Sequence, residues 1–456
     1  MARTSALAGL SFLVALLSII PVKADDWPQW LGPKRDGVWR ETGILEQFPK
    51  DGPKVRWKAP VGMGYAGPAV ADGRVYVFDR LLDKDAKNPG NPFSKEKVKG
   101  TERLLCLNEK DGQELWKHEY PCDYQISYAS GPRTTPIIQN DKVYGLGAMG
   151  DLFCLNAQDG KVIWSKNLAE EFKCDVPMWG FSASPLLDGD RLICLVGGND
   201  HIVIAFNKDT GKEIWHALSA KEPGYCPPVI VEAGGKRQLV IWHPESVNSL
   251  DPETGKLYWS EKLPVNAGMS IPTPRMEDGK LFVTGFYCGS MMMKLDSNKP
   301  SEQLLWKEKG RSEHPNNTKA LHAVMCTPFL RDGYIYGVCS YGQLRCLKAD
   351  TGERVWETLK ATGDAKEADE RWANAFLVAN GDRFFIPNEK GDLIIAKLTP
   401  KGYEEISRAH ILVPTNKSGG FGGPNRSIVW SHPAFANKSM YARNDKEIVC
   451  VSLAAE

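Results

Sequence analysis

The stretch "GPKVRW" at residues 52–57 is the first of a series of similar phrases that each end in tryptophan. The later phrases are GQELW, GKVIW, GKEIW, GKLYW, SEQLLW and GERVW, and they end at Trp116, Trp164, Trp215, Trp259, Trp306 and Trp356. Each later phrase closes a block of roughly fifty residues, a spacing typical of repeat architectures. Only a short segment precedes Trp57, so the first phrase has the form of a block end without its block.

The blocks open with a second recurring pattern, seen in "TPIIQNDKVYGLG" (135–147) and "TPFLRDGYIYGVC" (327–339). Two short apolar runs flank an Asn-Asp or Asp-Gly turn, which indicates a β-hairpin. A third apolar run follows, then Asp-Gly or Thr-Gly, then the run that ends in tryptophan. Eight such openings, with periods of about 45–50 residues and four short strands in a full block, predict an all-β, eight-bladed β-propeller of four-stranded antiparallel blades.

The last block stops at "EIVCVSL" (447–453) after three strands. Its missing fourth strand is supplied by residues 53–57, because a ring whose two chain ends share a blade leaves no blade edge open. We therefore predict a propeller over 53–456, with its last blade closed by the N-terminal strand. The seventh block departs from the pattern, since Ile406 stands where its tryptophan is expected.

The phrases "LNAQDGKVIW" (155–164), "LDPETGKLYW" (250–259) and "LKADTGERVW" (347–356) resemble the tryptophan-docking repeats of the pyrroloquinoline-quinone (PQQ)-like β-propeller superfamily. The stretch "DWPQWLGPKRDG" (26–37) is similar to the arm of exported bacterial members of that superfamily. The resemblance implies that the seven tryptophans dock neighbouring blades. The superfamily includes quinoprotein dehydrogenases, which use PQQ, and an outer-membrane-assembly lipoprotein that acts as a cofactor-free scaffold. The resemblance therefore implies the fold and leaves function open.

The N-terminus predicts export. Arg3 precedes an apolar run and Ala24 ends the segment, which fits a secretory signal peptide at 1–24 followed by an arm at 25–52. The apolar run is short for a membrane span, and no cysteine follows it as in a lipoprotein. We expect a periplasmic or secreted monomer without a membrane span after signal removal. The net charge of +1 gives no reason to expect nucleic acid as a partner.

One face of the predicted ring carries the long, unequal connections between blades and the polar insertion at 81–103. We interpret this insertion as a solvated loop. Long loops on a rigid scaffold are where binding residues usually lie. The residues that enter each inner strand on this face should rim the channel mouth. The candidates are Tyr128, Arg133, Trp179, Tyr225, His322, Trp372, Asn374, Trp430 and His432.

Aromatic rings with a few arginine and histidine residues suit a flat, partly anionic ligand or an extended peptide. The competing interpretation is structural: the aromatic rings fill the mouth, His322 and His432 are hydrogen-bonded within the fold, and the arginines pair with neighbouring carboxylates. The eleven cysteines divide in a similar way. Cys106, Cys154 and Cys346 fit buried strand positions, whereas Cys122 and Cys174 lie in loops and are the better candidates for reactive or bridged thiols.

Three functions remain open at this stage. A PQQ-dependent dehydrogenase oxidising an alcohol or sugar needs a stacking floor, a calcium ion held by oxygen ligands and a base. Trp179, Trp372 or Trp430 would be the floor and Asn374 an oxygen ligand, yet the chain has no adjacent cysteine pair and no carboxylates at the inner loop ends. We favour a cofactor-free binding or scaffold module, without catalytic or metal-binding residues, whose partner is a cell-envelope protein or polymer. A small-ligand sensor is the third alternative.

Overall fold

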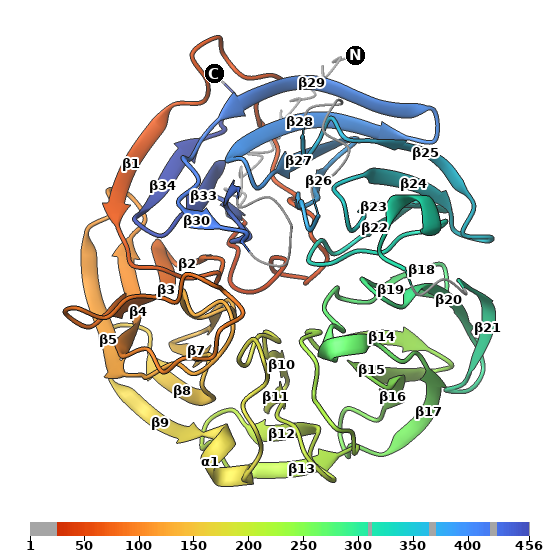
Figure 1. Ribbon diagram of the computed structural model, residues 1–456, viewed down its shortest axis with the longest axis horizontal. Coiled ribbons are helices and arrows are strands. Elements are labelled where there is room, and N and C mark those ends of the chain that lie inside the picture. The colour runs from red at the N-terminus through yellow and green to blue at the C-terminus, as the bar shows by residue number, and fades with distance from the viewer. Residues whose placement is uncertain (1–24, 309–311, 364–370, 420–425, 456) are drawn as a thin grey trace, which may run out of the picture.

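The structure is a computed structural model that describes residues 25–308, 312–363, 371–419 and 426–455. The predicted signal peptide at 1–24 lies outside these residues. Eight four-stranded antiparallel sheets are arranged as blades around a central channel (Figure 1). The eight-bladed propeller predicted from the repeats is confirmed. We number the blades 1 to 8 in the chain order of their innermost strands.

The first four blades each consist of four consecutive strands. Blade 1 contains β2 (Ala69–Ala71), β3 (Arg74–Leu82), β4 (Gly100–Asn108) and β5 (Glu114–Pro121). Blade 2 contains β6 (Ile137–Gln139), β7 (Lys142–Leu146), β8 (Asp151–Asn156) and β9 (Val162–Asn167). Blade 3 contains β10 (Leu186–Asp188), β11 (Arg191–Leu195), β12 (Val203–Asn207) and β13 (Glu213–Ala217). Blade 4 contains β14 (Val229–Ala233), β15 (Lys236–His243), β16 (Ser246–Leu250) and β17 (Leu257–Lys262).

Blades 5 to 7 follow the same order. Blade 5 contains β18 (Arg275–Glu277), β19 (Lys280–Gly285), β20 (Gly289–Leu295) and β21 (Glu302–Lys307). Blade 6 contains β22 (Phe329–Arg331), β23 (Tyr334–Val338), β24 (Leu344–Lys348) and β25 (Arg354–Thr358). Blade 7 contains β26 (Val378–Asn380), β27 (Arg383–Pro387), β28 (Asp392–Thr399) and β29 (Gly402–His410).

Blade 8 joins the two ends of the described chain. Its inner strands are β32 (Ala434–Ala436), β33 (Ser439–Arg443) and β34 (Glu447–Ser452), and its fourth strand is β1 (Val55–Pro60). Trp57 lies opposite Cys450 in the antiparallel pair of β1 and β34. The prediction that the first tryptophan phrase completes the last block is therefore correct. With β1 as its fourth strand, blade 8 has four strands like the other blades.

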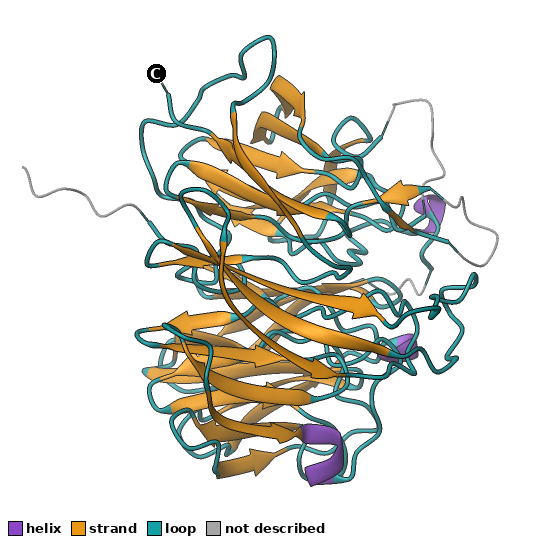
Figure 2. Ribbon diagram, turned by 90° about the vertical axis from the view of Figure 1, so that its left-hand side faces the viewer, coloured by secondary structure: helices purple, strands orange, loops and turns teal. Residues whose placement is uncertain are grey.

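The two faces of the ring differ. The three short helices, α1 (Leu168–Phe172), η1 (Asn266–Gly268) and η2 (Pro315–Asn317), lie in links between blades and share one side of the ring (Figure 2). The small sheet of β30 (Asn416–Lys417) and β31 (Ser427–Ile428) belongs to the link that precedes blade 8. We call this side the loop face, because the opposite side carries mostly tight turns between strands.

The tryptophans of the fourth strands bridge neighbouring blades. The indole N–H of Trp57 donates to the carbonyl of Glu109 in blade 1 at 2.8 Å, and that of Trp116 donates to Ala157 in blade 2 at 3.0 Å. The same bond recurs from Trp164, Trp215, Trp306 and Trp356 to Lys208, Pro252, Ala349 and Thr399. A buried indole needs such a partner for its N–H, so each bond fixes one blade against the next.

Two blades depart from this arrangement. Trp259 donates instead to the side chain of Gln238 in its own blade, at 2.9 Å. Ile406 of blade 7 faces blade 8, where the third and fourth strands come from opposite ends of the chain and no turn joins them. The arm supplies contacts there, since the backbone N–H of Phe48 donates to the Ser407 hydroxyl at 2.9 Å. A tryptophan at position 406 has no turn on which to dock.

The N-terminal arm fills the channel from the side opposite the loop face. Its backbone pairs with Val70 of blade 1 through Trp27 and with Ala379 of blade 7 through Trp39. Trp27 and Trp39 are buried, and the arm passes across the centre of the ring (Figure 1). The arm thus connects blades 1 and 7, which lie on either side of blade 8, and the sequence did not predict this contact.

Arg35 is the central contact of the arm. Its guanidinium donates to the carbonyls of Pro185 at 2.9 Å and Pro228 at 3.3 Å, in blades 3 and 4. Arg275 of blade 5 in turn donates to the carbonyl of Asp36 at 2.6 Å. Burial lowers the pKa of Arg35 to about 10, so the side chain is still charged at neutral pH. A charged donor surrounded by carbonyls holds the arm in the channel.

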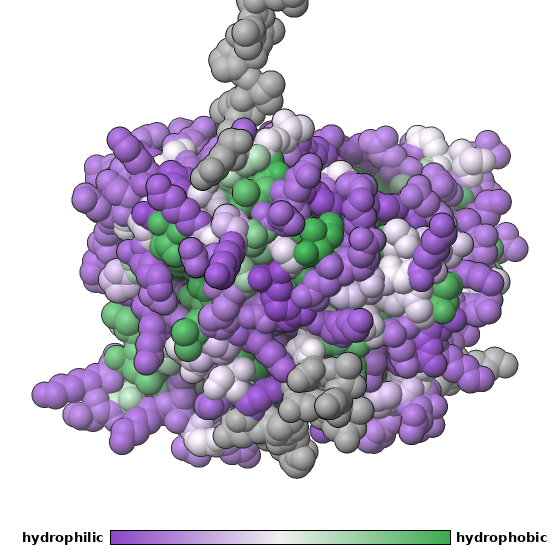
Figure 3. Space-filling view, turned by 90° about the horizontal axis from the view of Figure 1, so that it is seen from above, coloured by the Kyte–Doolittle hydropathy of each residue, from purple (hydrophilic) through white to green (hydrophobic). Residues whose placement is uncertain are grey.

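The outer wall seen in Figure 3 is largely hydrophilic, with small and scattered hydrophobic areas. In the described part of the chain, no helix has the length and apolar character needed to cross a membrane. All eleven cysteines carry free thiols. Cys106, Cys154 and Cys346 are buried on strands as predicted, whereas the loop residues Cys122 and Cys174 form no bridge.

Candidate functional site

The structure brings only some of the predicted rim residues together. Tyr128, Trp372 and Trp430 meet at the channel mouth on the loop face, together with two residues that the sequence did not single out, Tyr65 and Phe93. The ring centroids of Phe93 and Tyr128 lie 5.2 Å apart, those of Phe93 and Trp372 6.1 Å, and those of Tyr128 and Trp430 5.9 Å. Tyr65 lies 6.4 Å from Trp430. We call these five residues the mouth cluster.

Phe93 reaches the cluster from the insertion of blade 1. The strands β3 and β4 extend into the insertion at both ends, so the connection itself spans 83–99. The N–H of Tyr128 donates to the carbonyl of Pro92 at 2.6 Å, and the Ser127 hydroxyl donates to that of Phe93 at 3.2 Å. The interpretation of 81–103 as a solvated loop is therefore wrong for residues 92 and 93, which contact blade 2. Phe93 was missed because one apolar residue in a charged segment gives no periodic signal.

Two residues of the mouth cluster have an unusual backbone. Tyr128 has φ of 55° and Trp372 has φ of 65°, in the left-handed region that bulky residues rarely adopt. The Trp372 conformation is held by its N–H, which donates to the carbonyl of Ser340 at 2.7 Å. Such conformations persist where surrounding contacts impose them, and they concentrate at functional sites.

The arginines around the mouth are already paired within the fold. Arg133 donates to the carbonyl of Tyr128 at 2.6 Å and lies over the ring of Tyr65. Arg371 forms a two-point ion pair with Glu313, at 3.0 Å from Nε and 2.5 Å from Nη2. Burial acts to lower the pKa of Arg371, and the hydrogen bonds and charge of Glu313 outweigh it, so the net shift is upward. These cations are not free to bind an anionic ligand, contrary to one of the sequence interpretations.

Asn374 lies beneath the mouth beside a buried carboxylate. Glu389 in the β27–β28 turn is almost fully buried and accepts from Arg426 at 2.5 Å, from the indole of Trp430 at 2.9 Å and from the N–H of Asn374 at 3.2 Å. The side-chain nitrogen of Asn374 has no hydrogen-bond partner among the described residues, and neither has the indole N–H of Trp372. Glu389 was not identified from the sequence.

Trp179 and Tyr225 form a separate pair. They approach the loop face from blades 3 and 4, with ring centroids 5.5 Å apart. The Tyr225 hydroxyl is within 3.5 Å of the Trp179 backbone nitrogen, and burial raises the pKa of Tyr225. No ring contact joins this pair to the mouth cluster within the described residues, so the predicted rim is divided.

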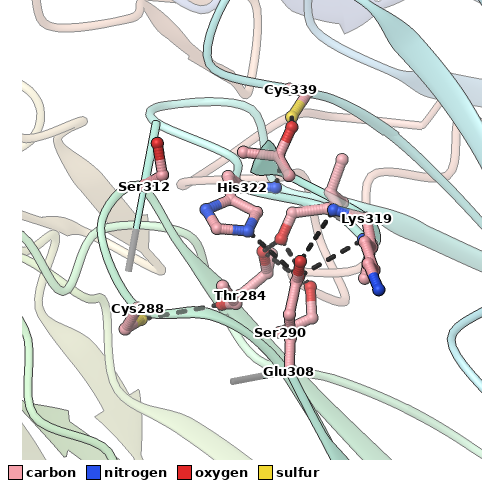
Figure 4. Close-up of polar contacts among 12 residues, drawn as sticks. Thr284, Cys288, Ser290, Glu308, Ser312, Lys319, His322 and Cys339 are labelled. Carbon is pink, nitrogen blue, oxygen red and sulfur yellow. Dashed lines mark hydrogen bonds and ion pairs between the residues drawn. The ribbon is translucent and has the colours of Figure 1, made fainter. Parts of the chain in front are cut away.

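His322 is fully buried, so its predicted place at the channel rim is wrong. The imidazole is fully buried between blades 5 and 6 and faces Glu308 (Figure 4). Its Nε2 lies 3.0 Å from a Glu308 oxygen and its Nδ1 lies 3.1 Å from the carbonyl of Phe286. Both imidazole nitrogens therefore face oxygen atoms of the fold. Burial acts to raise the pKa of Glu308, but the bond to His322 and its charge lower it overall.

His432 also lies away from the mouth. It is buried in the channel against the arm, with ring centroids 5.1 Å from Trp30 and 4.8 Å from Phe376. Its Nδ1 lies 2.7 Å from the carbonyl of Pro433. Burial lowers the pKa of His432 to about 4. The ring is neutral at physiological pH and holds the arm in place, which is the structural alternative raised for this residue.

The mouth residues do not fit PQQ with calcium. Both oxygens of Glu389 are engaged, and the neighbouring positive charge is supplied by Arg426. The mouth cluster is closed by Phe93, which packs against Trp372 and Tyr128 where a flat cofactor needs a stacking surface. The arm fills the channel below. A hard cation needs several free oxygen ligands, and these residues do not offer them.

One group of possible metal ligands occurs elsewhere in the described residues, formed by Glu102, Cys122 and Asp151 between blades 1 and 2. Glu102 already accepts from the hydroxyls of Tyr120 and Tyr124 and from the N–H of Ala148. Burial raises the pKa of Glu102, which favours its neutral form. The group is therefore a hydrogen-bonded network of the blade junction.

Sequence comparisons relate the chain to two kinds of protein. The family model described as "Outer membrane protein assembly factor BamB" matches residues 100–358, more than half of the chain. BamB of Salmonella typhimurium is 25% identical over 290 residues, which cover 61% of this chain and 66% of that protein. A quinoprotein ethanol dehydrogenase of Pseudomonas aeruginosa is 26% identical over 218 residues, 44% of this chain and 34% of the dehydrogenase. The match thus spans a third to two thirds of these relatives.

Solved structures show the same fold. BamB from Moraxella catarrhalis superposes with a TM-score of 0.50 at 13% identity, covering 82% of this chain and 98% of that one. A quinohemoprotein alcohol dehydrogenase from Comamonas testosteroni gives a TM-score of 0.59 at 12% identity, covering 94% and 81%. Identity at this level indicates the propeller fold alone. The family model matches more than half of the chain, so the chain belongs to the BamB-type family of PQQ-like β-propellers.

Proposed function

We propose that the chain is an exported, cofactor-free binding module of the cell envelope that holds a partner protein on its loop face. The observation that carries this proposal is the internal use of every charged group around the mouth described above, together with the arm in the channel. Among the described residues, the arginines at the mouth (Arg133, Arg371 and Arg426) are all engaged and leave no free guanidinium for a small anionic cofactor. The aromatic side chains that remain are those that anchor protein contacts.

The family match supports a partner in the assembly of outer-membrane proteins, as the name of the BamB relatives states for those proteins. A rigid ring with one face of long loops is suited to this role, because the loops vary without disturbing the blades. A periplasmic location is part of the same proposal, since the partner would be met there.

The proposal is tested by placing a photo-reactive amino acid at Met178 in cells that express the full chain. Met178 is exposed, with 37% of its surface accessible, in the link from blade 2 to blade 3 on the loop face. The matched control is Lys161, an exposed residue in the β8–β9 turn of the same blade, on the opposite face. We expect a crosslink from position 178 to an envelope protein of the outer-membrane assembly machinery, and none from 161. Equal crosslinking from both positions would contradict the proposal.

A further inference from the structure

The tip of the blade 1 insertion is seated in the mouth cluster as a peptide ligand would be. Two successive main-chain carbonyls, of Pro92 and Phe93, accept hydrogen bonds from Tyr128 and Ser127 of blade 2. The ring of Phe93 packs against the rings of both Tyr128 and Trp372. Main-chain bonds supply affinity and a pocketed side chain supplies specificity in peptide recognition. We call residues 91–94 the tip.

The seat of the tip is incomplete. With the tip in place, the indole N–H of Trp372 is buried and has no partner among the described residues, although Trp372 contacts Phe93 directly. Two residues further along, Asn374 is 3% exposed and its side-chain nitrogen is also unpartnered. Within the insertion, the side-chain oxygen of Asn88 is buried and has no hydrogen-bond partner in the described part of the chain. Unpaired buried polar groups weaken a contact, so a ligand with carbonyls that reach the Trp372 and Asn374 donors would bind more strongly.

The insertion is anchored independently of the tip. The N–H of Asp83 donates to the carbonyl of Lys99 at 3.3 Å, and Val98 and Tyr124 exchange two backbone bonds of 2.8 Å each. These bonds lie at the base of the connection, close to β3 and β4. The tip can therefore leave the mouth while the base keeps its pairing, and Lys95 and Glu96 beside it are exposed.

We propose that the tip is a built-in occupant of a peptide-binding site, displaced by an extended segment of a partner protein that carries an aromatic side chain. The inference rests on the proposed binding function and names the chemistry of its partner. The charge pattern favours an uncharged anchor, because Arg133 and Arg371 beside the site are already paired. The backbone N–H of Tyr128 and the hydroxyl of Ser127 would then bind the partner backbone, and its aromatic ring would take the place of Phe93 against Tyr128 and Trp372.

The test uses the purified mature chain and the labelled synthetic peptide PGNPFSKE, which copies residues 89–96. Phe93→Ser should empty the aromatic seat, and we expect it to bind the peptide at least tenfold more tightly than the unchanged chain, whose own tip competes at high effective concentration. Lys95→Ser alters an exposed residue two positions away and should bind like the unchanged chain. The peptide PGNPSSKE, which lacks the ring, should not bind.

Trp372→Gly in the Phe93→Ser background tests the seat itself. Because glycine adopts the left-handed conformation of position 372 without steric cost, this variant should fold, which its unfolding midpoint checks. We expect it to lose peptide binding by more than tenfold. Binding that is equal in Phe93→Ser and the unchanged chain, or that survives Trp372→Gly, would overturn the inference.

This experiment separates the two proposals. Tight peptide binding by Phe93→Ser without any crosslink from position 178 would support tip exchange and contradict the envelope-assembly partner. A specific crosslink from position 178 without peptide binding at the mouth would support the partner and place its contact elsewhere on the loop face. Anisotropy of the labelled peptide gives the affinities directly.

Discussion

Gly112, in the β4–β5 turn of blade 1, lies against the indole ring of Trp57 in β1. A Cβ atom at Gly112 would be 2.5 Å from Cε3 of Trp57, far inside van der Waals contact. The same relation recurs between Gly160 and Trp116, again at 2.5 Å. The Asp-Gly and Thr-Gly pairs of the repeats thus serve two purposes, because they allow a tight turn with positive φ and make room for the tryptophan of the preceding blade.

This relation predicts the effect of a single methyl group. Gly112→Ala should destabilise the protein by about 1–2 kcal/mol through its left-handed backbone and by a further 1–3 kcal/mol, approximately, through overpacking against Trp57. The matched control is Gly73→Ala, which has φ of 74° against 75° at Gly112 but no atom within 4 Å of the added carbon. Urea unfolding of both variants measures the difference. Equal losses of stability in the two variants would show that the Trp57 ring shifts to accept the added methyl group without a loss of free energy.

The arm should contribute strongly to stability through Arg35. Arg35→Met keeps the apolar stem and removes the guanidinium, which leaves the carbonyls of Pro185 and Pro228 buried without their donor. Leaving buried polar groups unpaired costs roughly 1–3 kcal/mol each, so we expect a loss of about 2–6 kcal/mol. Arg40→Met is the control, because Arg40 is exposed and its pair with Asp36 is worth about 1 kcal/mol or less. If Arg35→Met lowered the free energy of unfolding no more than Arg40→Met, Arg35 would not be the contact that holds the arm in the channel.

The buried His432 should make stability fall on mild acidification. Its pKa in the folded state is about 4, against an ordinary value of 6.5, so between these pH values the unfolded chain binds more protons. The stabilisation is complete above pH 6.5 and is lost as pH falls toward 4. Between pH 7.5 and 5.0 this corresponds to about 2 kcal/mol.

The variant His432→Asn isolates this contribution, since its amide can still donate to the carbonyl of Pro433. We expect the pH dependence of the urea midpoint to be smaller in His432→Asn than in the unchanged chain by the amount above. His216→Asn is the control, because His216 is exposed beside Glu213. Identical pH profiles for the unchanged chain and His432→Asn would mean that the ring is protonated within the fold.

PQQ should not bind in a calcium-dependent manner. The oxygens of Glu389 are occupied, and Arg133 and Arg371 beside the mouth are already paired, so neither the metal nor the anionic quinone finds a complete site. Titration of the purified chain with PQQ, with and without calcium, should show no saturable change in tryptophan fluorescence. A parallel dye-reduction assay over alcohols and sugars should show no turnover. Tight calcium-dependent binding with dye reduction would favour a dehydrogenase instead.

The sequence by itself determined the ring. Strand hairpins, turn glycines and docking tryptophans are local signals repeated at a constant spacing, so the number of blades and the shared closing blade followed from counting. The absent tryptophan at position 406 was visible too, but its reason was not. Only the structure shows that blade 8 has no turn between β34 and β1 on which a ring at 406 would dock.

The tertiary structure alone decided what occupies the channel and which rim residues meet. Arg35, Phe93 and Glu389 lie in segments without periodicity, and each contacts a residue more than thirty positions away in the sequence, namely Pro185, Trp372 and Arg426. His322 and His432 were predicted at the rim because each precedes an inner strand. In the folded chain, the His322 ring lies in the junction of blades 5 and 6, and the His432 ring packs against the arm. Repetition fixes the backbone of each blade, whereas side-chain contacts between blades depend on the closed ring, which no single repeat encodes.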